Sequence, residues 1–212
     1  RCGNMIKNII FDMGGVLIDY NPEKTLYGMF DKATADILLK EIFRNKIWAD
    51  KDRGVIFPEE IMAAKKDVIP EAVYEKVSEM VYNFYPCMPP FERMYGFVKT
   101  LKDNGYGIYL LSNASSDFHI RRQGIPALSL FDGVIVSADY KLLKPEKEIY
   151  EKLFSEFSLK PEECFFIDDM EANIKGAKAC GMKGFVFDTR DYEALEKALN
   201  AVATMITKEK PD

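Results

Sequence analysis

The chain lacks the marks of several classes of protein. It has no apolar run long enough to cross a bilayer and no signal peptide, so we expect no membrane partner. Its four cysteines show no close pairing in the sequence, which favours reduced thiols and a cytoplasmic location. The single histidine, His119, is expected to lie at the surface or at a helix end rather than to act in catalysis.

Basic blocks are missing as well. The 212 residues include 29 lysines and arginines against 34 aspartates and glutamates, which gives a formal net charge of -5. Without a basic stripe, the composition argues against a nucleic-acid partner. An anionic small substrate would have to be attracted by local positive groups, because the net charge does not favour it. The length allows one large domain, or a core with a smaller insert.

Short apolar stretches alternate with helical patterns over most of the chain. The stretches at 6–11, 107–113, 133–137, 164–169 and 184–187 predict buried strands. Helices are predicted over 91–103, 145–157, 171–180 and 192–208. Strands that alternate with helices predict an α/β fold, here a Rossmann-like parallel sheet of about five strands flanked by helices.

Residues 19–85 differ, because they show helical signals and no strand signal. Asn21 and Pro22 suit a helix start, and a break in the helical pattern comes near 48–54. Around this break, Trp48, Arg53 and Phe57 are candidates for substrate contact or for packing. We predict an all-helical cap inserted after the first strand. The predicted domains are a core of residues 1–18 and 86–212 and a cap of residues 19–85.

Polar residues end three of the predicted strands. They are Asp12 on the first, Ser112 and Asn113 on the second, and Asp168 and Asp169 on the fourth. The carboxyl ends of parallel strands meet at one edge of the sheet, where α/β proteins bind substrates. Carboxylates can hold a hard divalent cation, and a lysine such as Lys144 can neutralise phosphoryl oxygens. Since a carboxylate can also attack phosphorus, this set of residues suits phosphoryl transfer.

Four short motifs, taken in order, resemble the haloacid dehalogenase superfamily, in its type with a helical cap after the first strand. The first is Asp12-Met13-Gly14-Gly15-Val16, and the second ends a strand at Ser112. The third is Lys144-Pro145, and the fourth is Phe166-Ile167-Asp168-Asp169, followed by Asn173. The resemblance spans nearly the whole chain and implies a hydrolase.

The resemblance also implies a role for each matching residue. Asp12 would be the nucleophile, and Lys144 would bridge Asp12 and the phosphoryl group. Ser112 and Asn113 would hold phosphoryl oxygens. The implied ligands of a Mg²⁺ ion are Asp12, the backbone carbonyl of Gly14, Asp169, and Asp168 either directly or through water. Lys141 is an alternative to Lys144, but Lys144 has the proline after it and is preferred.

Gly14 departs from the family pattern, which carries at this place the general acid and base of its phosphatases. In this respect the chain resembles the α-D-glucose-1-phosphate phosphatases, which have glycine there and still hydrolyse phosphate esters. Asp19 is the nearest substitute donor, and it suits a role at the helix entry near Asn21 equally well. The alternative interpretation is that Gly14 only eases the turn, in a protein that no longer catalyses.

Together these features predict a Mg²⁺-dependent phosphatase that acts on a small phosphorylated metabolite, with a sugar phosphate as the expected substrate. A 2-haloacid dehalogenase is one alternative, although that branch has Tyr in place of Gly14 and lacks the acidic pair of Asp168 and Asp169. A catalytically silent binding protein on the same scaffold is another, and the intact Asp12 and Lys144 argue against it. We expect a monomer or a homodimer.

Overall fold

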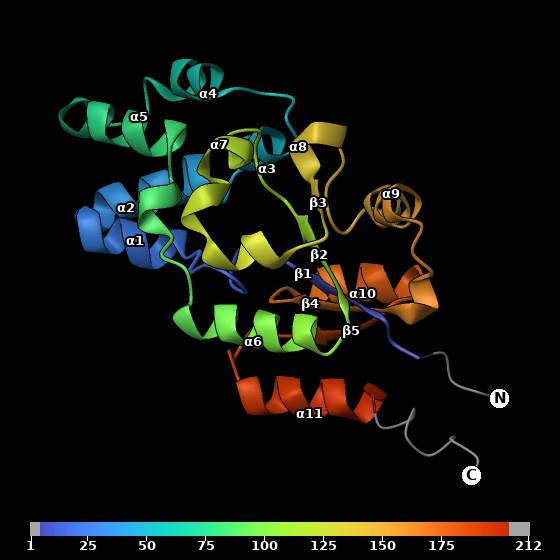
Figure 1. Cartoon of the computed structure of the whole chain (residues 1–212). Helices are drawn as coiled ribbons and strands as arrows, with labels where there is room; N and C mark the ends of the chain where they lie inside the picture. The colour runs from blue at the N-terminus through green and yellow to red at the C-terminus, as the bar shows by residue number, and fades with distance from the viewer. Residues whose placement is uncertain (1–4, 204–212) are drawn as a thin grey trace, which may run out of the picture.

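The computed structural model describes residues 5–203 (Figure 1). Cys2 and the predicted helical residues 204–208 lie outside the described residues. Five parallel strands form one sheet in the order β3-β2-β1-β4-β5, which confirms the predicted fold class. The strands are β1 (Asn8–Phe11), β2 (Gly107–Ser112), β3 (Gly133–Val136), β4 (Cys164–Asp168) and β5 (Lys183–Val186).

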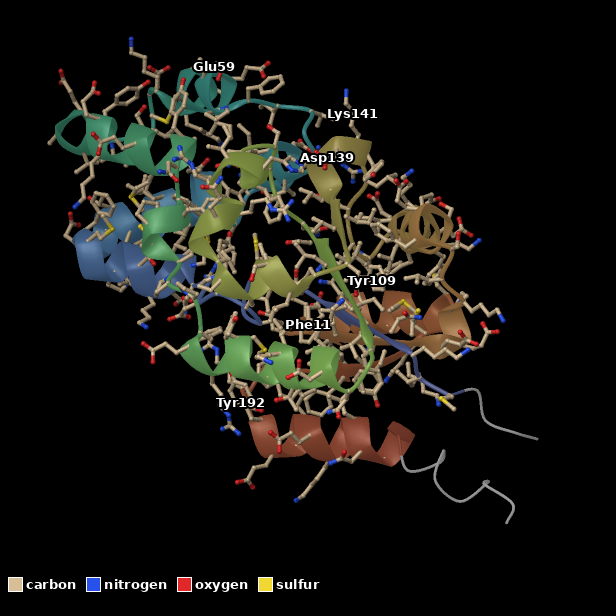
Figure 2. All side chains as sticks on the ribbon, in the orientation of Figure 1. Phe11, Glu59, Tyr109, Asp139, Lys141 and Tyr192 are labelled. Atoms are coloured by element: carbon tan, nitrogen blue, oxygen red, sulfur yellow. The ribbon has the colours of Figure 1, made fainter. Side chains whose placement is uncertain are left out.

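β1 is the central strand of the sheet, and its side chains alternate between two helical layers. Ile9 and Phe11 belong to the core under α6 (Glu92–Asp103) and α11 (Tyr192–Ala203). Ile10 faces the opposite layer, made by α9 (Lys147–Phe157) and α10 (Glu171–Ala179). Figure 2 shows Phe11 in the interior next to α6, where its ring meets that of Phe97 at 6.4 Å. Both faces of the sheet are covered, so the middle positions of the strands are apolar and polar residues occur only at their ends.

Between β1 and α6 the chain is helical and forms a group at one end of the molecule (Figure 1). We call residues 19–85 the cap segment; its separation from the core as a domain remains a prediction. Its α-helices are α1 (Pro22–Met29), α2 (Lys32–Leu38), α3 (Lys46–Asp52), α4 (Pro58–Lys65) and α5 (Tyr74–Tyr82). A π-helical turn at Leu39–Phe43 and 3-10 turns at Glu71–Val73 and Tyr85–Cys87 accompany them.

The remaining helices are short. They are α7 (Phe118–Arg121) and α8 (Ser137–Tyr140), with 3-10 turns at Arg122–Gly124, Pro126–Leu130 and Pro161–Glu163. No helix within residues 5–203 combines the length and apolar character that a membrane span requires.

Two predicted boundaries are wrong. Trp48 to Asp52 were assigned to a break, but they lie within α3, where Asn45 caps the helix by accepting from the Ile47 amide at 3.1 Å. The helix ends only before Gly54, which has a φ of +73° and stops it as glycines commonly do. Helix α9 starts at Lys147 rather than at Pro145.

The two chain segments that join the cap segment to the core run beside each other. The Asp19 amide donates to the Pro89 carbonyl oxygen, and the Phe91 amide donates to the Leu17 carbonyl oxygen, both at 2.9 Å. Ile18 and Pro90 form an isolated antiparallel bridge between them. The cap segment therefore leaves and rejoins the core at one place, next to the end of β1.

Candidate functional site

The predicted polar residues meet at the carboxyl end of the sheet. Phe11 lies opposite Ile167 in the register of β1 and β4, and the Asp12 amide donates to the Ile167 carbonyl oxygen at 2.9 Å. Asp12 and Asp168 therefore leave neighbouring strands at the same level. Carboxylate oxygens of Asp12, Asp168 and Asp169 all lie within 4.8 Å of one another.

Lys144 lies between two of these carboxylates. Its Nζ is 2.7 Å from Asp12 Oδ1 and 2.7 Å from Asp168 Oδ2, and its side chain is only 1% exposed. Burial lowers the pKa of Lys144, but the charges of Asp12 and Asp168 outweigh this and hold the pKa above its ordinary value. Lys144 therefore remains a cation beside the carboxylate cluster.

Asp168 is fully buried, and both of its carboxylate oxygens accept hydrogen bonds. Asn173 Nδ2 lies 3.0 Å from each oxygen, and the Met170 amide donates to Oδ1 at 2.8 Å. Tyr150 in turn donates to the Asn173 carbonyl oxygen at 2.8 Å. These contacts with Lys144 and Asn173 suit Asp168 to orienting the site, and they leave direct ligation of a cation chiefly to Asp12 and Asp169.

Burial raises the pKa values of two carboxylates that face the cavity, Asp169 and Asp12. It raises the pKa of Asp169 to about 6, assisted by the charge of Asp168 and opposed by Lys144. Burial likewise raises the pKa of Asp12, against the charge of Lys144. Lys144 supplies one positive charge against the three clustered carboxylates, which leaves negative charge that a divalent ion would neutralise.

The two glycines after β1 have different neighbours. Gly15 has a φ of +72°, and a Cβ there would lie 2.2 Å from Asp169 Oδ2, so a side chain would collide with the carboxylate cluster. At Gly14, where an acidic side chain is missing, an added Cβ would lie 3.2 Å from Tyr20 Cβ. The first residues of the cap segment thus occupy the space beside Gly14.

The two residues of the second predicted motif, Ser112 and Asn113, lie in different environments. Ser112 is buried at the end of β2 and is not part of the cavity wall, whereas Asn113 is. The Asn113 amide group binds the Lys144 backbone, accepting from its N–H at 2.8 Å and donating to its carbonyl oxygen at 3.1 Å. Asn113 therefore fixes the position of Lys144 in addition to facing the cavity.

Three other candidates lie away from the reacting groups. Lys141 is exposed beside α8 (Figure 2), and His119 pairs with Asp139 at 2.8 Å on the surface. Asp19 is ion-paired with Lys24 at 3.2 Å and with Arg190 at 3.1 Å, and it does not line the cavity.

A cavity of about 430 Å³ separates the carboxylate cluster from the cap segment. Aromatic rings form much of its far wall, with ring centroids 4.6 Å apart for Phe43 and Trp48 and 5.1 Å apart for Phe43 and Phe84. Two charged residues of α3, Lys51 and Asp52, also line it. The sequence offered no motif for either residue, since only the folding of α3 against the core brings them to the site.

Lys51 is a buried cation of the cap segment, at 5% exposure. Its Nζ lies 2.9 Å from Ser115 Oγ on the core and 4.6 Å from the centre of the Trp48 ring. The cavity consequently has positive groups on both sides, Lys144 from the core and Lys51 from the cap segment. Acidic side chains line the same cavity, so an anionic ligand would be attracted only next to these cations or through a bound metal ion.

Comparison with known proteins identifies the family to which the chain is similar. The model of a family described as haloacid dehalogenase-like hydrolases matches residues 6–181. The chain is 31% identical to the sesquiterpene phosphatase astK of Aspergillus oryzae, over 84% of this chain and 88% of that protein. It is 26% identical to the D-ribitol-5-phosphate phosphatase of Bacteroides thetaiotaomicron, over 85% and 91% of the two chains. A magnesium complex of a HAD family enzyme from the same bacterium shares the fold, with a TM-score of 0.72, 23% identity, and coverage of 92% of this chain and all of that one, 100%.

Proposed function

Because the chain belongs to the haloacid dehalogenase-like hydrolases, we propose that it is a Mg²⁺-dependent phosphatase that transfers a phosphoryl group to Asp12. The observation that carries this proposal is the buried bridge from Lys144 to Asp12 and Asp168, at 2.7 Å on each side, beside Asp169. A carboxylate nucleophile, a fixed cation and an oxygen cluster for a metal are the parts that phosphoryl transfer requires.

The donor set fits Mg²⁺, which takes oxygen ligands and keeps several waters. Asp12 and Asp169 would hold the ion, with the Gly14 carbonyl oxygen as a further ligand and Asp168 acting directly or through water. When bound, the ion would neutralise charge on the phosphoryl oxygens. The carboxylate cluster supports this fit, because burial and the neighbouring carboxylates raise the pKa values of Asp169 and Asp12.

The protein's own residues carry the chemical steps. The Met13 amide, at 2.6 Å, and Lys144 both bind Asp12 Oδ1, and they fix the orientation of the carboxylate that attacks phosphorus. Lys144 and Asn113 would face the phosphoryl oxygens, and Ser112 would assist as the resemblance implies. Phosphorus then passes from the ester oxygen to Asp12, and water releases it as phosphate. The apolar walls limit the access of bulk water to the aspartyl phosphate.

Two kinds of substrate follow from the same site. A sugar phosphate is the class expected from the sequence, and the similarity to D-ribitol-5-phosphate phosphatase supports a polyol phosphate. The aromatic wall formed by Phe43, Trp48 and Phe84 favours instead a phosphate ester of an apolar alcohol. The similarity to a sesquiterpene phosphatase supports this second class, which we rank first because that relative shares 31% identity with the chain against 26% for the D-ribitol-5-phosphate phosphatase.

The alternatives to a phosphatase fit the site less well. A 2-haloacid dehalogenase needs no metal, and it would leave the half-buried carboxylate of Asp169 beside Asp12 without a metal ion. A silent binding protein would not need the orientation that Lys144 and Met13 give to Asp12. A cytoplasmic location and a monomeric or homodimeric state remain predictions.

Turnover assays on matched esters test the proposal. With Mg²⁺, the protein should release phosphate from a panel that pairs polyol phosphates with prenyl or aryl phosphates of similar size. Asp12→Asn should abolish turnover while the fold is retained, because it removes the nucleophile and one metal charge. Beryllium fluoride should form its adduct on Asp12. Retained turnover in Asp12→Asn, or full turnover in excess chelator, would contradict the mechanism.

A further inference from the structure

The cavity holds one carboxyl group that the proposed mechanism does not use. The acidic residues that line the cavity are Asp12, Glu23, Asp52, Asp117 and Asp169. Three have a hydrogen-bond or ion-pair partner: Lys144 for Asp12, Arg44 for Glu23 and Ser115 for Asp117, while Asp169 belongs to the carboxylate cluster that is proposed to hold the metal. Within residues 5–203, the Asp52 carboxyl accepts no hydrogen bond and forms no ion pair. It is the acid of the cavity that is left available to a ligand.

Contacts with the core fix the position of Asp52. It is the last residue of α3, and Ser137 Oγ, itself fully buried, donates to its carbonyl oxygen at 2.5 Å. The next residue, Arg53, forms an ion pair with Glu146, two residues beyond Lys144. The backbone of Asp52 is thus bound to the core, while its side chain enters the cavity from the cap segment.

This side of the cavity is where a leaving group must point. Attacking and leaving oxygens lie roughly in line with phosphorus during phosphoryl transfer. Asp12 attacks from the sheet edge, so the ester oxygen faces the cap segment. Tyr20 fills the space beside Gly14, and the charges of both Asp52 and Asp169 act on its phenol. Its ring lines the same cavity as Asp52 and lies 6.0 Å from the ring of Phe84.

The surroundings of Asp52 favour a carboxyl group that exchanges protons near neutrality. The titratable groups that face it are Tyr20, Lys51, Tyr85 and Asp117. Burial raises the pKa of Asp52 to about 7, with Lys51 lowering it and Asp117 raising it. A group that can both give and accept a proton at working pH is suited to general acid and base catalysis.

We propose that Asp52 is the catalytic proton donor that replaces the acid missing at Gly14. This assignment rests on the proposed phosphatase function. As an Asp12 oxygen bonds to phosphorus, the ester P–O bond breaks, its electron pair stays on the leaving oxygen, and that oxygen takes the Asp52 proton to become an alcohol. In the second step the Asp52 carboxylate takes a proton from water as the water oxygen attacks phosphorus. The bond from Asp12 to phosphorus breaks, the electron pair returns to Asp12, and hydrogen phosphate leaves.

A series of esters with graded leaving groups tests the assignment. For the wild type and for Asp52→Asn, turnover of p-nitrophenyl, phenyl and benzyl phosphates with Mg²⁺ is measured as kcat/KM, which reports the transfer to Asp12 and not the later hydrolysis that all three esters share. The wild type should depend weakly on the leaving group. Asp52→Asn should lose about 10²- to 10⁴-fold on benzyl phosphate, whose alkoxide needs a proton, and only a few-fold on p-nitrophenyl phosphate. Retained p-nitrophenyl turnover also shows that the variant folds.

Asp50→Asn is the matched control, because Asp50 lies on the same helix, pairs with Lys46 at 2.5 Å and does not line the cavity. It should keep the wild-type pattern. If Asp52→Asn does not fold, the pH profile of kcat/KM for the wild type decides: the benzyl value should fall above about pH 7, the pKa of Asp52, while the p-nitrophenyl value should not. Equal losses on all three esters, or superimposable pH profiles for the benzyl and p-nitrophenyl esters, would overturn the assignment of Asp52 and leave the phosphatase proposal standing. A wild type that cleaves no ester with Mg²⁺ would overturn the phosphatase proposal and this assignment with it.

Discussion

Gly15 is the residue at which the loop after β1 leaves no room for a side chain. Its φ of +72° disfavours L-residues, and an added Cβ would meet Asp169 Oδ2 at 2.2 Å. Gly15→Ala should therefore lower the free energy of unfolding by about 1–3 kcal/mol, measured by urea denaturation. Because Asp169 must move, the variant should also lose Mg²⁺ affinity and turnover.

Gly105→Ala separates the loss of stability from the loss of Mg²⁺ affinity and turnover. Gly105 has a similar φ of +85°, but nothing lies within 4 Å of an added Cβ. This control should lose stability by about 1–2 kcal/mol and keep both Mg²⁺ affinity and turnover. Unchanged Mg²⁺ affinity in Gly15→Ala would show that Asp169 is not held where the structure places it.

The residues of the sheet edge were predictable, whereas those of the cap segment were not. Asp12 and Asp168 follow short apolar strands, and the parallel arrangement brings such ends together whatever the details of packing. Lys144 could be ranked above Lys141 from its neighbouring proline alone, and the structure places Lys144 in the cavity. Asp52 carries no local signal, because its position depends on how a helix from one segment docks on another.

At the scale of elements, α3 connects the cap segment to the core. Its end is held by the hydrogen bond from Ser137 and by the ion pair of Arg53 with Glu146. At Gly54 the chain also comes close to the core, since an added Cβ would lie 2.7 Å from the Ala138 carbonyl oxygen. The predicted break at 48–54 failed because Trp48 is apolar and suits a helix that packs on one face. The strands were placed more accurately, because buried parallel strands have an unbroken apolar pattern.

We expect Arg53→Gln to loosen α3 without unfolding the protein. The side chains of Arg53 and Glu146 are 28% and 35% exposed, so the pair contributes about 1 kcal/mol at most. Amide hydrogen exchange in α3 should rise about fivefold, which corresponds to ~1 kcal/mol, and exchange in β1 should not change. Turnover should fall, because α3 brings Lys51 and Asp52 into the cavity.

Lys65→Gln provides the comparison for this variant. Lys65 pairs with Glu41 at 3.0 Å, with side chains 17% and 24% exposed, and both residues belong to the cap segment. Its loss should leave exchange in α3 and turnover near wild-type values. Equal exchange in α3 for the two variants would indicate that the ion pair of Arg53 does not hold the cap segment on the core.

At the scale of the whole molecule, the buried carboxylates link stability to pH and to metal. Burial raises the pKa of Asp169 from 3.8 to about 6, so the folded protein binds more protons than the unfolded chain between these values. Without metal, this group makes folding less stable as pH rises from about 4 to 6. Mg²⁺ at the proposed site would bind the ionised carboxylates and reverse the trend, because protons and the cation would compete for the same oxygens.

The stabilisation by Mg²⁺ should therefore grow with pH. Below the pKa of a ligand, affinity weakens about tenfold per pH unit, which at saturating Mg²⁺ removes ~1.4 kcal/mol of stabilisation. Thermal unfolding with millimolar Mg²⁺ and with chelator should give a small difference in Tm at pH 5 and a larger one at pH 8, where Asp169 is ionised and the raised pKa of Asp12 is also approached. Asp169→Asn should reduce the difference at pH 8, since it removes one ligand charge, while Asp132→Asn, on a surface carboxylate paired with Lys102, should not. A difference in Tm that is the same at both pH values, or that survives Asp169→Asn, would place the Mg²⁺ ion elsewhere than at this carboxylate cluster.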